Sequence, residues 1–215
     1  RSSDLEQKLD KAGLELPEDT ELNVRGKEHP WVSRGGMKLA HAIAHFGMDV
    51  KGAIAMDVGA STGGFTDVLL THGAAKVYAV DVGRGQLDAK LRDDARVVVM
   101  EKTNARHLTP EMAEPLDLVV CDTSFISLKK VLPAALALTK KQAKLVTLIK
   151  PQFEVGKVEV SRGKGVIRDG ALHSAVCEDI SHWLTEMGWA VNGITPSPIT
   201  GPKGNVEFLL MATKG

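Results

Sequence analysis

The feature that most constrains the fold is an alternation of short apolar runs with amphipathic segments, which begins after Ser33. The apolar runs are five to seven residues long, a length that suits buried strands, and they lie at 53–57, 76–82, 96–100, 116–121 and 144–149. Segments with a helical spacing of apolar residues lie at 37–46, 64–72, 128–139 and 171–187. This alternation is typical of a parallel sheet with right-handed crossovers and helices on both faces.

Two further apolar runs, 189–194 and 206–212, follow the last predicted helix and are joined by a loop that contains Pro and Gly. That loop is too short for a crossover helix, so we expect the last strand to be antiparallel. We therefore predict a doubly wound, Rossmann-like α/β fold with a seven-stranded, mostly parallel sheet. Residues 152–169 have no clear period, and we predict a mobile loop there.

Residues 1–30 differ from the rest because they are polar and carry charges of both signs. Their only periodic piece is a short strand predicted at 21–25, and they are too few to bury a core. We expect them to be the tail of an amino-terminal module plus a linker. Residues 31–215 then form the main domain.

Composition excludes several classes of protein. With 43% hydrophobic and 25% charged residues, the chain is globular rather than disordered. No run approaches the roughly 18 apolar residues that span a bilayer, and no apolar leader is evident, so we expect a cytoplasmic protein. Two cysteines, Cys121 and Cys177, do not make a disulfide framework. The 27 Lys and Arg balance 27 Asp and Glu, so a nucleic-acid partner must be recognised by local clusters of charge.

A glycine-rich turn at 57–66 follows the first predicted strand and opens a helix. Such a turn brings the backbone close to a ligand, and three ligands compete for it. A nucleoside-triphosphate loop needs Lys where Phe65 stands, and a dinucleotide fingerprint needs Gly where Ser61 stands. The third ligand, S-adenosylmethionine, needs a carboxylate for its ammonium group and backbone amides for its carboxylate, and Asp57 with the glycine turn offers both.

Further polar residues follow the next predicted strands. Asp81 can accept both ribose hydroxyls of an adenosine, or it can simply cap the turn that follows. Asn104 can reach the adenine edge, or it can form a local Asx turn. The expected cofactor site consists of Asp57, Gly59, Ala60, Ser61, Thr62, Gly63, Gly64, Phe65, Asp81, Val82, Asn104 and Asp122.

Four charged residues are predicted to converge on one rim of the sheet. Asp122 and Lys150 end apolar strands, Lys38 lies on the helix before the first strand, and Glu207 is placed in the last strand. A charge in such surroundings is costly unless it is paired. His41 and His45 have helical spacing but no evident third ligand, so we expect no metal site.

The segments that carry these residues, 33–39, 57–66, 122–127, 150–156 and 204–207, resemble the TlyA family of hemolysin-like, FtsJ-type ribosomal RNA methyltransferases. The resemblance covers about residues 30–213. It implies a class I methyltransferase that uses S-adenosylmethionine, with a Lys-Asp-Lys-Glu tetrad for ribose 2′-O methylation at Lys38, Asp122, Lys150 and Glu207. It also implies ribosomal RNA in ribosomal subunits as the partner, cytidine as the target, and an amino-terminal RNA-binding domain of which residues 1–30 are the tail.

The chemistry of a ribose hydroxyl gives each member of the tetrad a role. The hydroxyl must lose its proton as it attacks, and we expect Lys150 to take that proton. Lys38 then positions the hydroxyl, and the two acids hold the lysines. Basic residues near this rim are candidates for RNA phosphates or are merely solvated loop charges, and they are Arg34, Lys157, Arg162, Lys164 and Arg168.

Aromatic residues make up only 4% of the chain, which leaves Trp31, Phe125 and Phe153 as the few candidates for base stacking. Two other functions compete with methyl transfer. One is a membrane-lytic protein, which the hemolysin name suggests although no lytic amphipathic helix is evident. The other is an RNA-binding scaffold without catalytic activity, which would tolerate changes in the tetrad.

Overall fold

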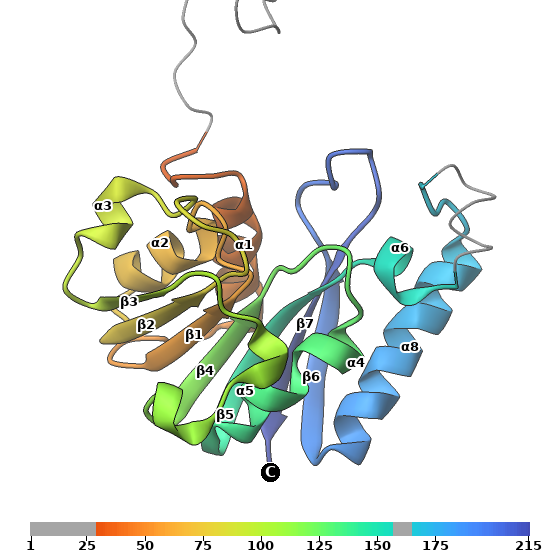
Figure 1. The fold of residues 1–215 in the computed structure, drawn as a ribbon. Coiled ribbons are helices and arrows are strands. Elements are labelled where there is room, and N and C mark those ends of the chain that lie inside the picture. The colour runs from red at the N-terminus through yellow and green to blue at the C-terminus, as the bar shows by residue number, and fades with distance from the viewer. Residues whose placement is uncertain (1–28, 157–164) are drawn as a thin grey trace, which may run out of the picture. The chain divides into compact units, whose positions relative to one another are not determined.

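A seven-stranded sheet is the centre of the fold (Figure 1). We describe the protein from a computed structural model, and the structure describes residues 29–156 and 165–215. In spatial order the strands are β3 (Val97–Met100), β2 (Lys76–Val80), β1 (Ile54–Val58), β4 (Leu116–Cys121), β5 (Thr139–Ile149), β7 (Phe208–Lys214) and β6 (Trp189–Pro196).

Strands β1 to β5 pair in parallel, and β7 is antiparallel to both of its neighbours, β5 and β6. The predicted fold, a mostly parallel sheet with an antiparallel last strand, is confirmed. Ile149 at the end of β5 faces Phe208 at the start of β7. Because β7 runs in the opposite direction, its first residue lies at the same edge of the sheet as the carboxyl ends of β4 and β5.

Helices cover both faces of the sheet and bury a separate apolar core on each (Figure 1). One face is covered by α1 (Gly35–Phe46), α2 (Gly64–Thr71) and α3 (Ala89–Arg92). The other face is covered by α4 (Leu128–Val131), α5 (Pro133–Ala137) and α8 (Gly170–Glu186). The shorter elements are the 3-10 helices η1 (Ala105–His107) and η2 (Pro110–Met112), and α6 (Pro151–Glu154).

Three predictions need correction. The single helix predicted at 128–139 is two short helices, because Pro133 begins α5, and Thr139 already belongs to β5. The loop predicted at 152–169 contains most of α6 at its start. Glu207 was predicted inside the last strand, but it lies one residue before β7.

The strand predicted at 21–25 and residues 157–164 of the predicted loop lie outside the described residues. Within the part of the chain that the structure describes, no helix is both long and apolar enough to cross a lipid bilayer.

Candidate active site

The topology brings the four predicted charged residues together at one edge of the sheet. Asp122 directly follows β4 and Lys150 directly follows β5. Glu207 directly precedes β7, so it lies across the β5–β7 ladder from Lys150. Lys38 comes from the first turn of α1, which packs on the same region of the sheet. The convergence therefore depends on strand order rather than on closeness in the sequence.

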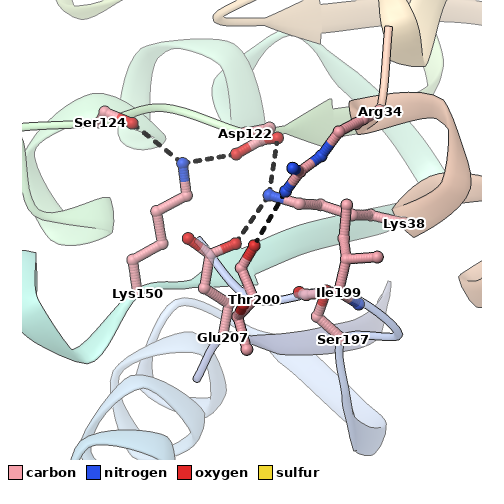
Figure 2. Close-up of polar contacts among 9 residues, drawn as sticks. All are labelled: Arg34, Lys38, Asp122, Ser124, Lys150, Ser197, Ile199, Thr200 and Glu207. Atoms are coloured by element: carbon pink, nitrogen blue, oxygen red, sulfur yellow. Dashed lines mark hydrogen bonds and ion pairs between the residues drawn. The ribbon is translucent and has the colours of Figure 1, made fainter. Parts of the chain in front are cut away.

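Figure 2 shows that the four side chains form one network. Lys38 Nζ donates to Glu207 Oε2 at 2.7 Å and lies 3.4 Å from Asp122 Oδ2. Lys150 Nζ lies 2.6 Å from Asp122 Oδ1 and donates a hydrogen bond to Ser124 Oγ at 3.0 Å. Asp122 therefore bridges the two lysines, one with each of its carboxylate oxygens.

Three members of the network are buried. Lys38, Lys150 and Glu207 have only 7%, 6% and 2% of their surface exposed, whereas the side chain of Asp122 is 17% exposed. Two lysines and two carboxylates carry no net formal charge together, so each charge in the network has a partner of opposite sign. Ser124, which was not predicted as a site residue, supplies an additional polar contact to this network.

The loop between β6 and β7 fixes Glu207. The buried side chain of Asn205 accepts a hydrogen bond from the Ile167 amide at 3.0 Å and donates one to the Gly165 carbonyl at 2.9 Å. A Cβ atom on Gly201 would lie 2.7 Å from Glu207 Oε1, so any other residue there would displace the carboxylate from its present position. Neither Asn205 nor Gly201 was predicted, because their roles depend on contacts with other segments.

A second cluster of hydrogen bonds ties α6 to the loop after β4. The Glu154 carboxylate accepts hydrogen bonds from Ser127 Oγ at 2.6 Å and from the Leu128 amide at 2.9 Å. Burial raises the pKa of Glu154, and the bond from Ser127 opposes that shift. Between these anchors Phe125 is 90% exposed, adopts a φ of 66°, and has its ring centroid 5.0 Å from that of Phe153.

The glycine turn lies next to the network. Gly59 has a φ of 85°, and a Cβ atom there would lie 2.8 Å from Thr123 Cγ2. Asp57 is 1% exposed, and its Oδ2 accepts hydrogen bonds from the Thr66 amide at 3.0 Å and from Thr66 Oγ1 at 2.7 Å. Its Oδ1 is buried and has no hydrogen-bond partner among the described residues. Burial raises the pKa of Asp57 to about 7, and the bonds from Thr66 oppose this shift.

The other predicted cofactor residues make local contacts. Asp81 accepts hydrogen bonds from the Ser61 amide at 2.8 Å and from the Gly83 amide at 2.7 Å, so it does cap the turn that follows β2. Asn104 Oδ1 accepts from the Arg106 amide at 3.1 Å, which is the local Asx-type contact. Val82 is 71% exposed beside them. These contacts leave the predicted roles of Asp81, Val82 and Asn104 in cofactor binding as predictions.

An open cavity of about 1560 Å³ joins the two halves of the site. Its wall includes the whole tetrad, Asp57 and most of the glycine turn. Asp81 borders a separate void of about 10 Å³, which shares Ala60 and Ser61 with the large cavity. Besides the two lysines of the tetrad, the basic side chains that line the large cavity are Arg34, Arg106, Lys130 and Lys203.

Of the predicted RNA-binding residues, Arg34 is exposed, lines the cavity and donates to the Thr200 carbonyl at 3.4 Å (Figure 2). Arg168 is exposed but is not part of the cavity wall. Lys157, Arg162 and Lys164 lie outside the described residues. Arg106, Lys130 and Lys203 were not predicted, because they lie outside the two basic clusters that the sequence places beside the rim.

Residues 31–214 match the family model of FtsJ-like methyltransferases. The chain belongs to the FtsJ-like methyltransferase family. It is 51% identical over 188 residues to the 16S/23S rRNA (cytidine-2′-O)-methyltransferase TlyA of Mycobacterium tuberculosis, which covers 87% of this chain and 70% of that relative. It is 44% identical over 207 residues to a Bacillus subtilis protein provisionally named rRNA methyltransferase YqxC, with 95% and 73% covered.

A solved structure from Streptococcus thermophilus, of a protein provisionally named a hemolysin, superposes with a TM-score of 0.85 at 43% identity. The match covers 88% of this chain and 69% of that chain. This chain is thus similar both to proteins named as rRNA methyltransferases and to one named as a hemolysin. Its place in the FtsJ-like family confirms the predicted family resemblance. This chain is therefore a methyltransferase with the Rossmann-like fold of that family.

Proposed function

We propose that this FtsJ-like methyltransferase transfers a methyl group from S-adenosylmethionine to a ribose 2′-hydroxyl of ribosomal RNA. The observation that carries the proposal is the Lys38–Asp122–Lys150–Glu207 network, buried at the wall of an open cavity that also contains the glycine turn. A reaction at a hydroxyl needs a base beside the site of attack, and this network places two amines there.

The residues around the glycine turn fit S-adenosylmethionine. Asp57 Oδ1 is a buried carboxylate oxygen without a partner among the described residues, which suits the ammonium group of that molecule. Gly59 has no side chain between its backbone and the cavity that it lines, so the backbone can approach a ligand there closely. Asp81, Val82 and Asn104 would hold the adenosine, by the ribose hydroxyls and the adenine ring. Bound S-adenosylmethionine supplies a methyl group on a positively charged sulfur, which keeps the electron pair of the broken carbon–sulfur bond.

The tetrad would handle the proton of the ribose hydroxyl. Lys150 accepts that proton at Nζ as the oxygen gains the methyl group, which requires the neutral amine. Lys38 is held by two carboxylates and positions the hydroxyl by donating a hydrogen bond to it. Asp122 orients both amines, since it contacts each of them.

RNA is supported as the substrate by the cavity and by the relatives. Outside the tetrad, the described residues of the cavity wall include four with basic side chains and two with acidic ones, Asp57 and Glu154. That excess suits phosphate groups although the whole chain has no net charge. Phe125, exposed at the cavity wall beside Phe153, offers an aromatic face to a nucleotide base.

The finer features of the substrate come from the relative named as a 16S/23S rRNA (cytidine-2′-O)-methyltransferase. By analogy we propose cytidine as the target and assembled ribosomal subunits in the cytoplasm as the substrate. We also propose that residues 1–30 end an RNA-binding module, and that Lys157, Arg162, Lys164 and Arg168 contact RNA phosphates.

Substitution of Lys150 tests the proposed reaction. We expect Lys150→Met to lower the rate of methyl transfer to ribosomal RNA about 1000-fold, because a general base contributes 10²–10⁴. Affinity for S-adenosylmethionine should stay within about threefold. The exposed Lys51, changed to Met, is the matched control and should leave the rate unchanged. Full activity of Lys150→Met would exclude Lys150 as the base, whereas a scaffold without catalysis predicts no methyl transfer by the wild-type chain either.

Calorimetric titration with S-adenosylmethionine tests the cofactor separately. We expect micromolar binding to the wild-type chain and at least tenfold weaker binding to Asp81→Ala, because two ribose hydroxyls lose their acceptor. An unchanged affinity in Asp81→Ala would remove Asp81 from the cofactor site. Lysis of red cells by the purified, detergent-free protein would instead favour the membrane-lytic alternative.

A further inference from the structure

The two lysines of the tetrad differ in what surrounds their amines. Lys38 Nζ faces two carboxylates, Glu207 at 2.7 Å and Asp122 at 3.4 Å. Lys150 Nζ faces one carboxylate, Asp122 at 2.6 Å, and the uncharged hydroxyl of Ser124 at 3.0 Å (Figure 2). Loss of a proton from Lys38 therefore gives up two ion pairs, whereas loss of a proton from Lys150 gives up one.

Ser124 also determines the direction of the Lys150 amine. The contact between Lys150 and Asp122 is an ion pair whose angle does not suit a hydrogen bond. Within the described part of the chain, Ser124 Oγ is the only hydrogen-bond acceptor of Lys150 Nζ. A hydroxyl can accept from an ammonium and can also donate to the lone pair of a neutral amine, so this contact survives loss of the proton. A carboxylate at the same place could not donate, and it would favour the charged amine.

Other charged groups line the same cavity as Lys150. Among the described residues outside the Lys150–Asp122 pair, they are Arg34, Lys38, Asp57, Arg106, Lys130, Glu154, Lys203 and Glu207. Of these, Glu154 is engaged with Ser127 and the Leu128 amide, and Glu207 is engaged with Lys38. A substitution at Ser124 removes none of these groups, so it changes the surroundings of Lys150 selectively.

We propose that Ser124 is a positioning residue that makes Lys150, rather than Lys38, the base of the reaction. The inference rests on the proposed function. The proton of the ribose hydroxyl passes to the neutral Nζ of Lys150, and the resulting ammonium returns one proton to solvent before the next turnover. Ser124 gains and loses no proton overall. It keeps the Lys150 amine in the same direction in the neutral and in the charged state, without adding a negative charge.

Three substitutions of Ser124 distinguish its effect on the position of the Lys150 amine from the effect of an added charge. Ser124→Thr keeps the hydroxyl and should retain kcat within about threefold. Ser124→Ala removes the hydrogen bond and should lower kcat about tenfold with KM for RNA and for S-adenosylmethionine nearly unchanged, because a hydrogen bond to a charged group is lost. Ser124→Asp adds a carboxylate beside Lys150 and should move the rise of the pH–rate profile to higher pH by about one unit or more. The exposed Ser174, changed to Asp, controls for an added surface charge and should leave the profile in place.

A second readout does not depend on catalysis. In the chain without RNA or S-adenosylmethionine, NMR of lysines labelled at Cε should show the Lys150 titration midpoint at higher pH in Ser124→Asp and unchanged in Ser124→Thr. A folded Ser124→Asp variant with wild-type pH dependence in both measurements would overturn the inference, as would wild-type kcat in Ser124→Ala. A wild-type chain that does not methylate ribose would instead contradict the proposed function, while the NMR titration would still test Ser124.

Discussion

The two halves of the cavity, the tetrad and the glycine turn, are held by different kinds of contact. In the tetrad, charged side chains from four distant segments contact one another: Lys38–Glu207 is a buried ion pair, and Lys150–Asp122 is a partly buried one. Around the glycine turn, carboxylates mainly contact neighbouring backbone amides: Asp57 accepts from the Thr66 amide, and Asp81 accepts from that of Ser61.

The difference shows what each half is built to do. The backbone contacts around Asp57 fix one carboxylate oxygen and leave Oδ1 without a protein partner among the described residues, which suits a site that binds a ligand. In the tetrad each amine already contacts a carboxylate, so a substrate hydroxyl must exchange contacts with groups that are already paired. We therefore expect substitutions in the tetrad to act mainly on kcat, and substitutions around the glycine turn to act mainly on affinity.

Glu207→Gln should show most clearly that the tetrad half of the cavity acts on kcat. Lys38 would then keep a single carboxylate, Asp122 at 3.4 Å, in a buried place. We expect kcat to fall about 30–100-fold. Loss of one member of a buried ion pair costs several kcal/mol, and rearrangement of the neighbouring groups recovers only part of that free energy. Single-turnover rates with saturating RNA measure this directly. If KM for S-adenosylmethionine changed instead of kcat, the division between the two halves would be wrong.

Gly201→Ala perturbs the same carboxylate without removing it. The new Cβ atom would lie 2.7 Å from Glu207 Oε1 and would displace it, so we expect kcat to fall about tenfold. Gly170→Ala is the matched control, because a Cβ atom there meets nothing within 4 Å. Equal activity of the two variants would show that the exact place of Glu207 is unimportant.

Asp57 should make the affinity of the glycine half for S-adenosylmethionine depend on pH. Because burial raises its pKa to about 7, the ionised fraction of Asp57 rises about tenfold between pH 6 and 8. An ammonium group binds the ionised form, so we expect affinity for S-adenosylmethionine to rise by about the same factor relative to Asp57→Asn. Calorimetry in two buffers of different ionisation enthalpy should show a proton released on binding below pH 7. Identical pH dependence in wild type and Asp57→Asn would contradict this.

The raised pKa of Asp57 also predicts how the stability of the folded chain changes with pH. The pKa of Asp57 is higher in the folded chain than its ordinary value of 3.8. Its contribution to stability is therefore fully present below about pH 4 and is lost as the pH rises towards 7. Thermal melts of wild type and Asp57→Asn should converge or cross over this range, whereas a constant difference between them would show that Asp57 is not buried as described.

The rim of the cavity should show the smallest effects. Arg34→Gln and Lys130→Gln each remove one basic side chain from the cavity wall. We expect each to weaken RNA binding about two- to fourfold, with the slope of log affinity against log salt reduced by about one. Lys140→Gln is the control, because Lys140 pairs with Asp117 rather than lining the cavity. An unchanged salt slope in both rim variants would place the RNA elsewhere.

Local patterns predicted most of the fold. Six of the seven strands begin within two residues of where their apolar runs do, because each run is bounded by charged or turn-forming residues. The exception is β5, whose first part, Thr139–Ala143, includes Lys140 and Lys141 and resembles the end of a helix. Its strand state comes from pairing with β4, where Leu116 faces Thr139, and a single-segment pattern does not contain that pairing.

The site was predictable to the extent that its residues end strands or belong to the motifs of the family. Asp122, Lys150 and Glu207 were found in this way, although Glu207 was placed one residue too deep in its strand. Ser124 and Asn205 were not found, because a single serine or asparagine in a loop carries no periodic signal. Their roles arise only in the folded chain, where Ser124 in the loop after β4 meets Lys150 and Asn205 in the β6–β7 loop meets Gly165 and Ile167.

The most direct test of the account is to find where the methyl group goes. Ribosomal subunits from cells without this enzyme should be incubated with the protein and methyl-labelled S-adenosylmethionine, and the RNA digested to nucleosides for mass spectrometry. When the glycosidic bond is broken in the spectrometer, the account predicts that the label stays with the ribose, on a cytidine. A label on the base fragment would contradict a tetrad that deprotonates a ribose hydroxyl.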